Sequence, residues 1–227
     1  MALILNIETS TTNCSVSLAK GGEVLFLKET AEEGYSHGEK LHGFIKDVFN
    51  ETNVEPNSLD AIAVSKGPGS YTGLRIGVSA AKGLCYALDK PLIATETLEA
   101  LARQIAIKDG KIISMLDARR MEVYAAVFGA NYELERDVKA EILEPNIYDA
   151  YIEGGSEIVF IGNSVQKTKA VLVDHKTGVR YVEALPSAKE MAQISEMKYK
   201  KSDVEDVAYF EPYYLKDFIA IKPKPLF

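Results

Sequence analysis

The chain has 227 residues, 47% of them hydrophobic and 26% charged, and a formal net charge of −7. This length supports a packed core in one or two domains, and an acidic chain is poorly suited to binding nucleic acid alone, since phosphate neutralisation needs clustered lysine and arginine. The sequence contains no run of about 18 apolar residues, the length that a membrane-spanning helix needs. No basic region precedes the first apolar run, as one would in a secretory signal peptide. We therefore expect a cytoplasmic protein with no membrane partner.

The first half reads as strands followed by strand–helix alternation. Apolar runs and alternating patterns predict strands over residues 2–7, 14–19, 24–28, 59–64 and 91–95. A Gly21-Gly22 pair predicts a hairpin between the second and third strands. Helical periodicity predicts helices over residues 36–50, 72–88 and 96–107. Ser36 and Glu39 predict a capping box at the start of the first helix.

The helix over 72–88 follows a Gly67-Pro-Gly69 turn and carries two stripes of small or apolar residues. One stripe is Leu74, Val78, Ala81, Cys85 and Leu88, and the other is Gly73, Gly77, Ala80, Leu84 and Ala87. A surface helix normally shows one apolar face, so two stripes predict packing on two sides. The second neighbour is either a helix of a partner or another part of the same domain, and the pattern fits both.

The second half repeats the opening of the first. Its expected strands span residues 111–116, 121–128, 132–143, 157–161 and 178–182, and its helices span 164–172 and 188–199. Both halves begin with a strand, a polar turn and further strands, which indicates an internal duplication with a boundary at 108–110. We expect an α/β fold with an N-terminal half over 1–107 and a C-terminal half over 108–227, whose tail packs back on the first half.

Four motifs resemble the TsaB family, a subunit of the bacterial machinery that makes threonylcarbamoyladenosine in transfer RNA. They are Ile7-Glu-Thr-Ser10, the segment 65–77, Asp117-Ala-Arg119 with Glu122-Val-Tyr124, and Pro212-Tyr-Tyr-Leu-Lys216. The resemblance spans nearly the whole chain. It implies an actin-like ATPase (ribonuclease H-like) fold of two duplicated mixed-sheet halves flanked by helices.

The resemblance also implies partners. The catalytic paralogue TsaD transfers the threonylcarbamoyl group, a TsaE ATPase joins the assembly, and the helices over 36–50 and 72–88 form the contact with TsaD or a homodimer. The interface residues expected on these helices are Leu41, Phe44, Ile45, Val48, Gly73, Gly77, Ala80 and Leu84. This subunit then acts as a scaffold without a catalytic residue, and tRNA reaches it only through the complex.

A nucleotide site is expected only as a vestige, built from Glu8, Thr9, Ser10, Gly67 and Gly69. The uncharged Thr11, Thr12 and Asn13 after Glu8 offer few ligands of the kind Mg²⁺ prefers, and no Walker lysine follows the glycines. We expect no intrinsic cofactor, with ATP and Mg²⁺ bound by the partner subunits. Asp117, Arg119 and Glu122 fit either a polar cluster near the cleft or a turn with a salt bridge.

Metal and peptidase chemistry find little support. The histidines are His37, His42 and His175, and the first two lie five residues apart, about 140° around a helix, so we expect surface or interface positions and no metal. Ser70 lacks a local base and is interpreted as a helix cap. Cys14 and Cys85 fall on apolar patterns and are expected to be buried. A stand-alone actin-like ATPase and a glycoprotease-type metallopeptidase remain the alternatives.

Overall fold

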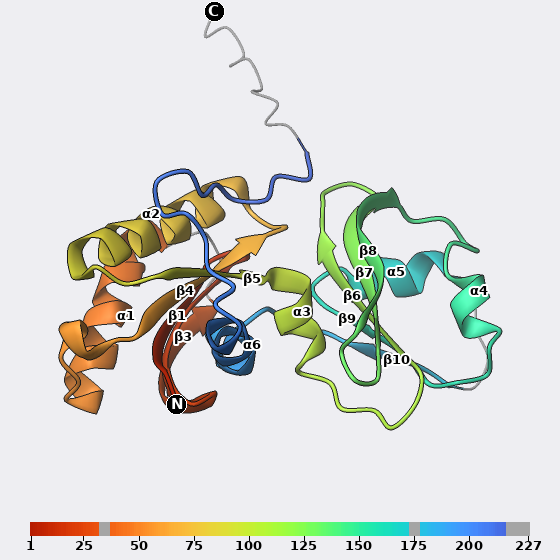
Figure 1. The fold of residues 1–227 in the computed structure, drawn as a ribbon. Coiled ribbons are helices and arrows are strands. Elements are labelled where there is room, and N and C mark those ends of the chain that lie inside the picture. The colour runs from red at the N-terminus through yellow and green to blue at the C-terminus, as the bar shows by residue number, and fades with distance from the viewer. Residues whose placement is uncertain (32–36, 173–177, 217–227) are drawn as a thin grey trace, which may run out of the picture.

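Two five-stranded mixed sheets organise the chain, one in each lobe (Figure 1). The structure is a computed structural model that describes residues 1–31, 37–172 and 178–216. The strands of the first sheet are β1 (Leu3–Glu8), β2 (Asn13–Lys20), β3 (Glu23–Ala31), β4 (Ala61–Gly67) and β5 (Leu92–Glu96). Those of the second are β6 (Lys111–Asp117), β7 (Glu122–Gly129), β8 (Leu134–Ile142), β9 (Ile158–Ile161) and β10 (Val179–Val182).

The two sheets share one strand topology. The first has the order β3-β2-β1-β4-β5 and the second, read from the opposite edge, the order β8-β7-β6-β9-β10. In each, the first three strands pair antiparallel, whereas the last two run parallel to the first. The duplication predicted from the sequence is confirmed: the fold is α/β, with two mixed-sheet halves flanked by helices.

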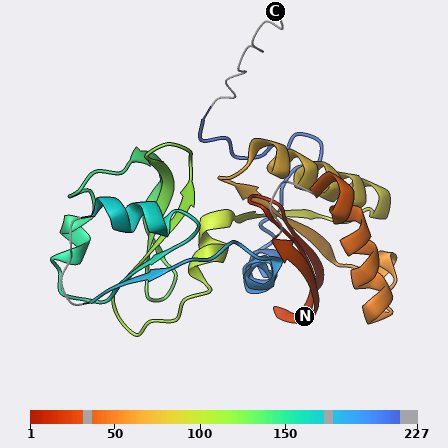
Figure 2. The ribbon, with the colours of Figure 1, turned by 180° about the vertical axis from the view of Figure 1, so that it is seen from behind.

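Helices cover both faces of the first sheet (Figures 1 and 2). The helices are α1 (His37–Thr52), α2 (Tyr71–Leu88), α3 (Thr97–Ala102), α4 (Asp149–Ile152), α5 (Val165–Val171) and α6 (Ala188–Lys200), with a 3₁₀ turn at Pro56–Ser58. Leu5 and Ile7 of β1 pack toward α1 and α2, whereas Ile4 packs toward α6. This alternation of side chains along one buried strand is what divides the core into two layers.

Helix α3 joins the lobes. Its Leu98 and Leu101 pack against Ile112, Phe128 and Ile161 of the second sheet. The helix ends earlier than the predicted 96–107, because Gln104 N and Ile105 N donate to Leu101 O and Ala102 O, at 3.2 and 3.0 Å, in the three-residue pattern of a turn. Helix α4 was not predicted, since four residues are too few to show a helical period.

The C-terminal segment belongs to the first lobe. Ala188, Met191 and Ile194 of α6 form one hydrophobic cluster with Ile4 and Ile93. Further on, Glu205 N donates to Leu92 O at 2.8 Å, and Lys82 Nζ donates to the carbonyls of Ala208 and Phe210. The second sheet begins at Lys111, close to the expected boundary, but residues 188–216 return to the first sheet rather than remaining with the second half.

Several local predictions hold. Gly21 and Gly22 have φ of 63° and 87° in the β2–β3 turn, Ser70 caps α2, and the side chains of Cys14 and Cys85 are buried. Burial raises the pKa of the Cys14 thiol to about 11 and that of Cys85 to about 12. Ser36 of the predicted capping box lies outside the described residues. Among the described helices, none is long and apolar enough to cross a bilayer.

Candidate functional site

The turn between β1 and β2 lies inside the first lobe. Glu8, Thr9 and Ser10 are 0%, 0% and 1% exposed. Glu8 Oε1 accepts hydrogen bonds from Ser10 N at 2.6 Å and from Ser65 Oγ at 2.9 Å. Burial raises the pKa of the Glu8 carboxyl above its ordinary value, although the bonds from Ser10 and Ser65 act in the opposite direction. The side chain therefore braces the ends of β1 and β4.

The glycine junction closes the space beside this turn. Ser70 N donates to Ser10 O at 2.6 Å, and a Cβ on Gly69 would lie less than 3.0 Å from the same oxygen. Gly67 has φ of 118° and a Cβ there would lie 2.8 Å from Tyr213 O. Protein backbone therefore occupies the positions next to Glu8, Thr9 and Ser10. The five residues expected as a nucleotide vestige do come together, but they form a packed junction.

The glycine stripe of α2 serves the same junction. A Cβ on Gly73 would lie less than 3.0 Å from Thr9 O, and one on Gly77 would lie less than 3.0 Å from Thr9 Oγ1. Thr9 Oγ1 donates to Gly73 O at 2.8 Å. These glycines therefore let α2 approach the chain's own β1–β2 turn. The interpretation of Gly73 and Gly77 as contacts for a partner helix is corrected: the second neighbour belongs to the same domain.

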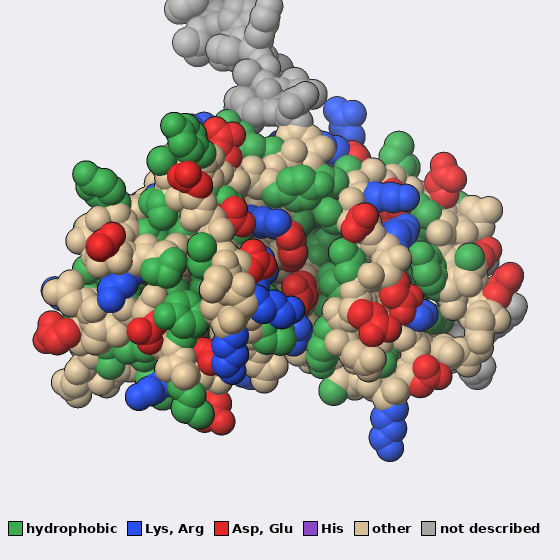
Figure 3. Space-filling model, viewed as in Figure 1, with side chains coloured by type: hydrophobic (Ala, Val, Ile, Leu, Met, Phe, Trp, Pro, Cys, Tyr) green, Lys and Arg blue, Asp and Glu red, His purple; other side chains and the backbone are tan. Residues whose placement is uncertain are grey.

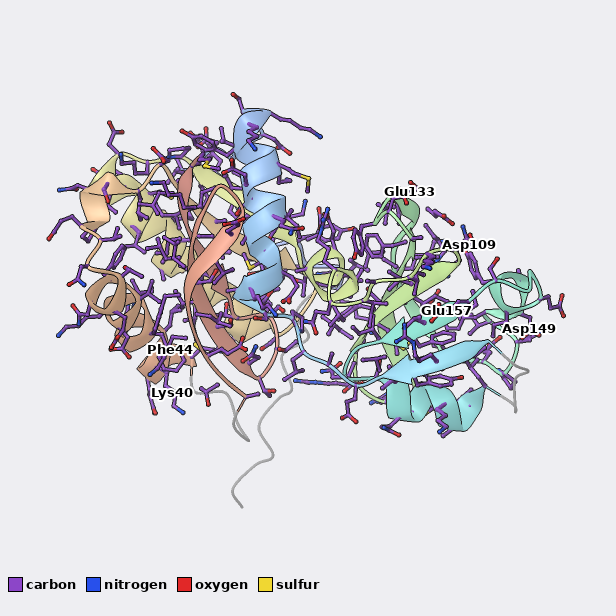
Figure 4. All side chains as sticks on the ribbon, turned by 90° about the horizontal axis from the view of Figure 1, so that it is seen from below. Lys40, Phe44, Asp109, Glu133, Asp149 and Glu157 are labelled. Carbon is purple, nitrogen blue, oxygen red and sulfur yellow. The ribbon has the colours of Figure 1, made fainter. Side chains whose placement is uncertain are left out.

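The apolar face of α1 is also internal. Leu41, Ile45 and Val48 are 0%, 7% and 0% exposed and pack in the core under the first sheet, so they offer no surface to a partner. Phe44 is half-buried, with Lys28 Nζ 5.8 Å from its ring centre, and Figure 4 shows it with Lys40 on the outside of the lobe. Of the eight expected interface residues, Phe44, Ala80 and Leu84 border the solvent side of the helix pair.

A groove of about 730 Å³ runs between the outer faces of α1 and α2. Its α1 wall includes Gly38 and His42, and its α2 wall includes Arg75, Ile76, Ala80 and Leu84. Gly38 and Gly83 line it with open space where a Cβ would stand. Here the small residues leave a hollow that nothing in the described chain fills.

The sequence pattern missed these outward glycines. Gly83 lies three residues after Ala80 and seven after Ile76, so all three share a helix face that the two-stripe analysis did not separate. Polar residues such as Arg75 and Ser79 mark the exposed face of this helix, and this signal in the sequence would have identified it.

The histidines fall in different surroundings. His37 is 1% exposed and its Nε2 lies 2.6 Å from Thr11 O, and burial lowers its pKa. The expectation of a surface or interface position is therefore wrong for His37, whereas His42 is exposed in the groove. His175 lies outside the described residues. No three His, Cys, Asp or Glu side chains of the described ranges cluster as a metal site needs.

A second hollow, of about 480 Å³, lies between the lobes. Lys66 and Glu96 form an ion pair of 2.5 Å in its wall, and Tyr213 of the C-terminal segment covers one end. Figure 3 shows charged side chains of both signs in this hollow between the two lobes. Because Glu99 is paired with Arg103 at 2.8 Å, most of the charge here is already compensated.

The polar turn between β6 and β7 decides between the two interpretations of Asp117, Arg119 and Glu122. Asp117 is paired with Lys167, and Glu122 with Lys216. Arg119 N donates to Asp117 Oδ1 at 3.2 Å. Asp117, Arg119 and Glu122 therefore belong to a turn with salt bridges at the top of the second lobe (Figure 1).

Several known proteins are similar to this chain in sequence. Residues 30–223 match the family model described as TsaD: tRNA N6-adenosine threonylcarbamoyltransferase. The chain belongs to this family. Within it, the TsaB protein of Escherichia coli (strain K12) is 28% identical over 228 residues, 98% of each chain. The TsaB protein of Bacillus subtilis (strain 168) is 29% identical and covers 94% of this chain and 93% of its own. The TsaB resemblance is confirmed.

Two further comparisons concern a transferase and a solved structure. A tRNA N6-adenosine threonylcarbamoyltransferase of Staphylococcus haemolyticus is 37% identical, but over 106 residues that make 40% of this chain and 31% of the transferase. A Pseudomonas aeruginosa crystal structure described as similar to the peptidase YeaZ superposes with a TM-score of 0.80 at 24% identity, covering 95% of this chain and 100% of the other. The two TsaB proteins thus align with nearly the whole of this chain, and this transferase aligns with part of it.

Proposed function

We propose that this chain is a non-catalytic, cytoplasmic subunit of the machinery that makes threonylcarbamoyladenosine in bacterial tRNA. The observation that carries the proposal is similarity to TsaB proteins over 98% of the chain. The name of those relatives assigns them to threonylcarbamoyladenosine biosynthesis without stating a reaction. The transferase of Staphylococcus haemolyticus aligns with 40% of this chain, although the family model that carries the transferase name matches residues 30–223.

The closed junction supports a non-catalytic role. An actin-like ATPase holds phosphates beside the first turn, but here Gly69, Ser70 and Gly73 pack against Ser10 and Thr9. Glu8 is fully buried, and its oxygen Oε1 is engaged by Ser10 and Ser65. Phosphate or Mg²⁺ would have to displace backbone to reach it. ATP and Mg²⁺ are therefore assigned to partner subunits, and a stand-alone ATPase gains no support from this geometry.

The groove between α1 and α2 is the proposed docking site for a TsaD-type partner. A transferase of this family is 37% identical to 40% of this chain, and the proposal gives it a corresponding pair of helices side by side. Two such helix pairs can meet across a pseudo-twofold axis, each placing side chains in the other's groove. The half-buried Ile76, Leu84 and Phe44 supply apolar area, and Gly38 and Gly83 leave room.

The same geometry allows a homodimer when the partner is absent, because the groove of one copy can receive the helices of another. A TsaE-type ATPase then joins the heterodimer, and the tRNA substrate binds the assembled complex. Docking supports the transferase through contacts that favour its productive conformation.

Reconstitution tests the proposal. Purified chain is combined with the TsaD-type and TsaE-type proteins of the same organism, the supply of activated threonylcarbamoyl and a tRNA transcript, and modified adenosine is quantified by mass spectrometry. We expect product only when both the chain and the TsaD-type protein are present, and no phosphate release when the chain is given Mg-ATP alone. Full modification without the chain, or ATP hydrolysis by the chain alone, would contradict the proposed role.

A further inference from the structure

The α1–α2 groove differs in charge from the rest of the chain. Its lining contains Arg75 and His42 but, within the described part of the chain, no aspartate or glutamate. Helix α2 has no acidic residue at any position, and the acidic residues of α1 do not line the groove. Because the whole chain carries a net charge of −7, an acid-free face with an arginine is the opposite of what its composition predicts.

Arg75 has no acidic partner in the chain. Its side chain is exposed, and its Nη1 donates a hydrogen bond to the Tyr71 hydroxyl at 2.9 Å. The guanidinium carbon lies 5.3 Å from the centre of the same ring. Neither contact neutralises the charge, and no carboxylate of residues 1–31, 37–172 and 178–216 forms an ion pair with Arg75. The other N–H donors of the guanidinium group remain for a planar acceptor, which a carboxylate supplies in two-pronged form.

The C-terminal segment fixes the ring that holds Arg75. The rings of Tyr214 and Tyr71 stack with their centres 4.8 Å apart and their planes tilted by 34°. The segment is anchored just before Tyr214, because Tyr213 N donates to Lys66 O at 2.7 Å. Tyr71 thus keeps its hydroxyl group in place for Arg75. A side chain that is already held in position loses less conformational entropy when a partner binds it.

A second copy of the chain matches this groove poorly. In a twofold dimer both copies present the same surface, so each groove meets residues like its own. The described lining offers a guanidinium group and no carboxylate, and burying a charge without a partner is costly. A partner helix with a carboxylate on its apolar face can instead fill the groove and pair with Arg75. This difference favours a heterodimer over a homodimer.

We propose that Arg75 determines which partner binds the groove: the occupant is a helix of the TsaD-type protein whose apolar face carries a carboxylate, and this carboxylate forms a bidentate ion pair with the Arg75 guanidinium. The inference rests on the proposed function and deepens it, because it adds the chemistry that the groove requires of its occupant. The half-buried Ile76 and Leu84 lie in the same lining and exclude water around the pair.

The test measures the two kinds of association separately. The dissociation constant with the TsaD-type protein of the same organism is obtained by isothermal titration calorimetry at low and at raised salt, and the self-association constant by sedimentation equilibrium. Arg75→Gln removes the charge and keeps a donor. Arg120→Gln is the matched control, because Arg120 is also an exposed arginine but follows β6 in the second lobe. Circular dichroism checks that each variant is folded.

We expect Arg75→Gln to weaken the heterodimer about thirtyfold, which corresponds to about 2 kcal/mol for one lost partner of a buried ion pair, and to reduce its salt dependence. Self-association should be no weaker than in wild type, and Arg120→Gln should behave as wild type. Equal heterodimer affinity of the two variants would overturn the inference and leave the proposed function intact. An equal loss in the homodimer would assign the carboxylate to a second copy and overturn it too. Absence of binding between wild type and the TsaD-type protein would overturn the proposed function, and the inference with it.

A charge reversal tests the carboxylate itself. Arg75→Glu should abolish the heterodimer, because two carboxylates would then face one another. Each acidic residue on the docking helices of the TsaD-type protein is next replaced by lysine, one at a time. One of these partner variants should restore binding to Arg75→Glu and should bind wild type more weakly than the unchanged partner does. Failure of every lysine variant to restore binding would contradict the proposed ion pair.

Discussion

At the scale of single residues, residue type alone did not predict the structural roles of Glu8 and Thr9. Glu8 was predicted to belong to a vestigial nucleotide site, but it braces the turn: its Oε1 accepts from Ser10 and Ser65, and the side chain is fully buried. Thr9 was predicted at the same site, and its hydroxyl donates to Gly73 O. At this scale a residue's role depended on which neighbour filled the space beside it.

The raised pKa of Glu8 predicts a pH dependence of stability. Because the folded-state pKa lies above the ordinary value, the folded state holds its proton more tightly, and Glu8 contributes stability that is full below about pH 4.5 and is lost as pH rises through the folded pKa. Glu8→Gln keeps an acceptor for Ser10 and Ser65 and removes this titration. We expect the free energy of unfolding of the variant, relative to wild type, to rise as pH increases from about 4.5 to the folded-state pKa of Glu8, and to stay constant at higher pH.

Urea unfolding at a series of pH values measures this difference. His37→Gln serves as a reference, since burial lowers the pKa of His37 and its contribution changes with the opposite sign. Parallel pH profiles for Glu8→Gln and wild type would show that folding leaves the pKa of Glu8 unchanged and would contradict the raised pKa.

At the scale of elements, the strands and helices were largely predictable, whereas their outward and inward faces were not. Strand β1 was recognisable because five of its six residues are buried and most of them are apolar, with Asn6 and Glu8 the polar exceptions. Helix α2 was recognisable by its period, but both of its stripes contain small residues. Only the approach of Thr9 to Gly73 and Gly77, a contact between positions more than 60 residues apart, decides which stripe is internal.

The two kinds of glycine in α2 predict opposite effects of alanine. Gly73→Ala places a Cβ against Thr9 O, so we expect destabilisation of about 1–3 kcal/mol from overpacking. Gly83→Ala meets nothing within 4 Å, so we expect stabilisation of about 0.5–1 kcal/mol from the lower backbone entropy of the unfolded chain. Chemical unfolding of both variants beside wild type tests the difference. Equal effects would mean that α2 is oriented differently.

At the scale of the whole molecule, the duplication was visible in the sequence because each half opens with the same strand and turn order. The return of α6 to the first sheet was not, because Ala188, Met191 and Ile194 form an apolar face that either sheet could accept. The C-terminal segment then crosses from Leu92 to Glu122 and ties the lobes together.

The central claim is that the chain works by docking a TsaD-type partner in the α1–α2 groove. The measurement that tests it most directly is the mass in solution, by size-exclusion with light scattering, of wild type and of Gly83→Leu, each alone and mixed with that partner. The leucine side chain would enter the hollow at a position with open space, so the variant should fold while its complex is lost. We expect a 1:1 heterodimer with wild type and no mass shift with a folded Gly83→Leu. A complex of equal affinity in both forms, or none with wild type, would contradict the account.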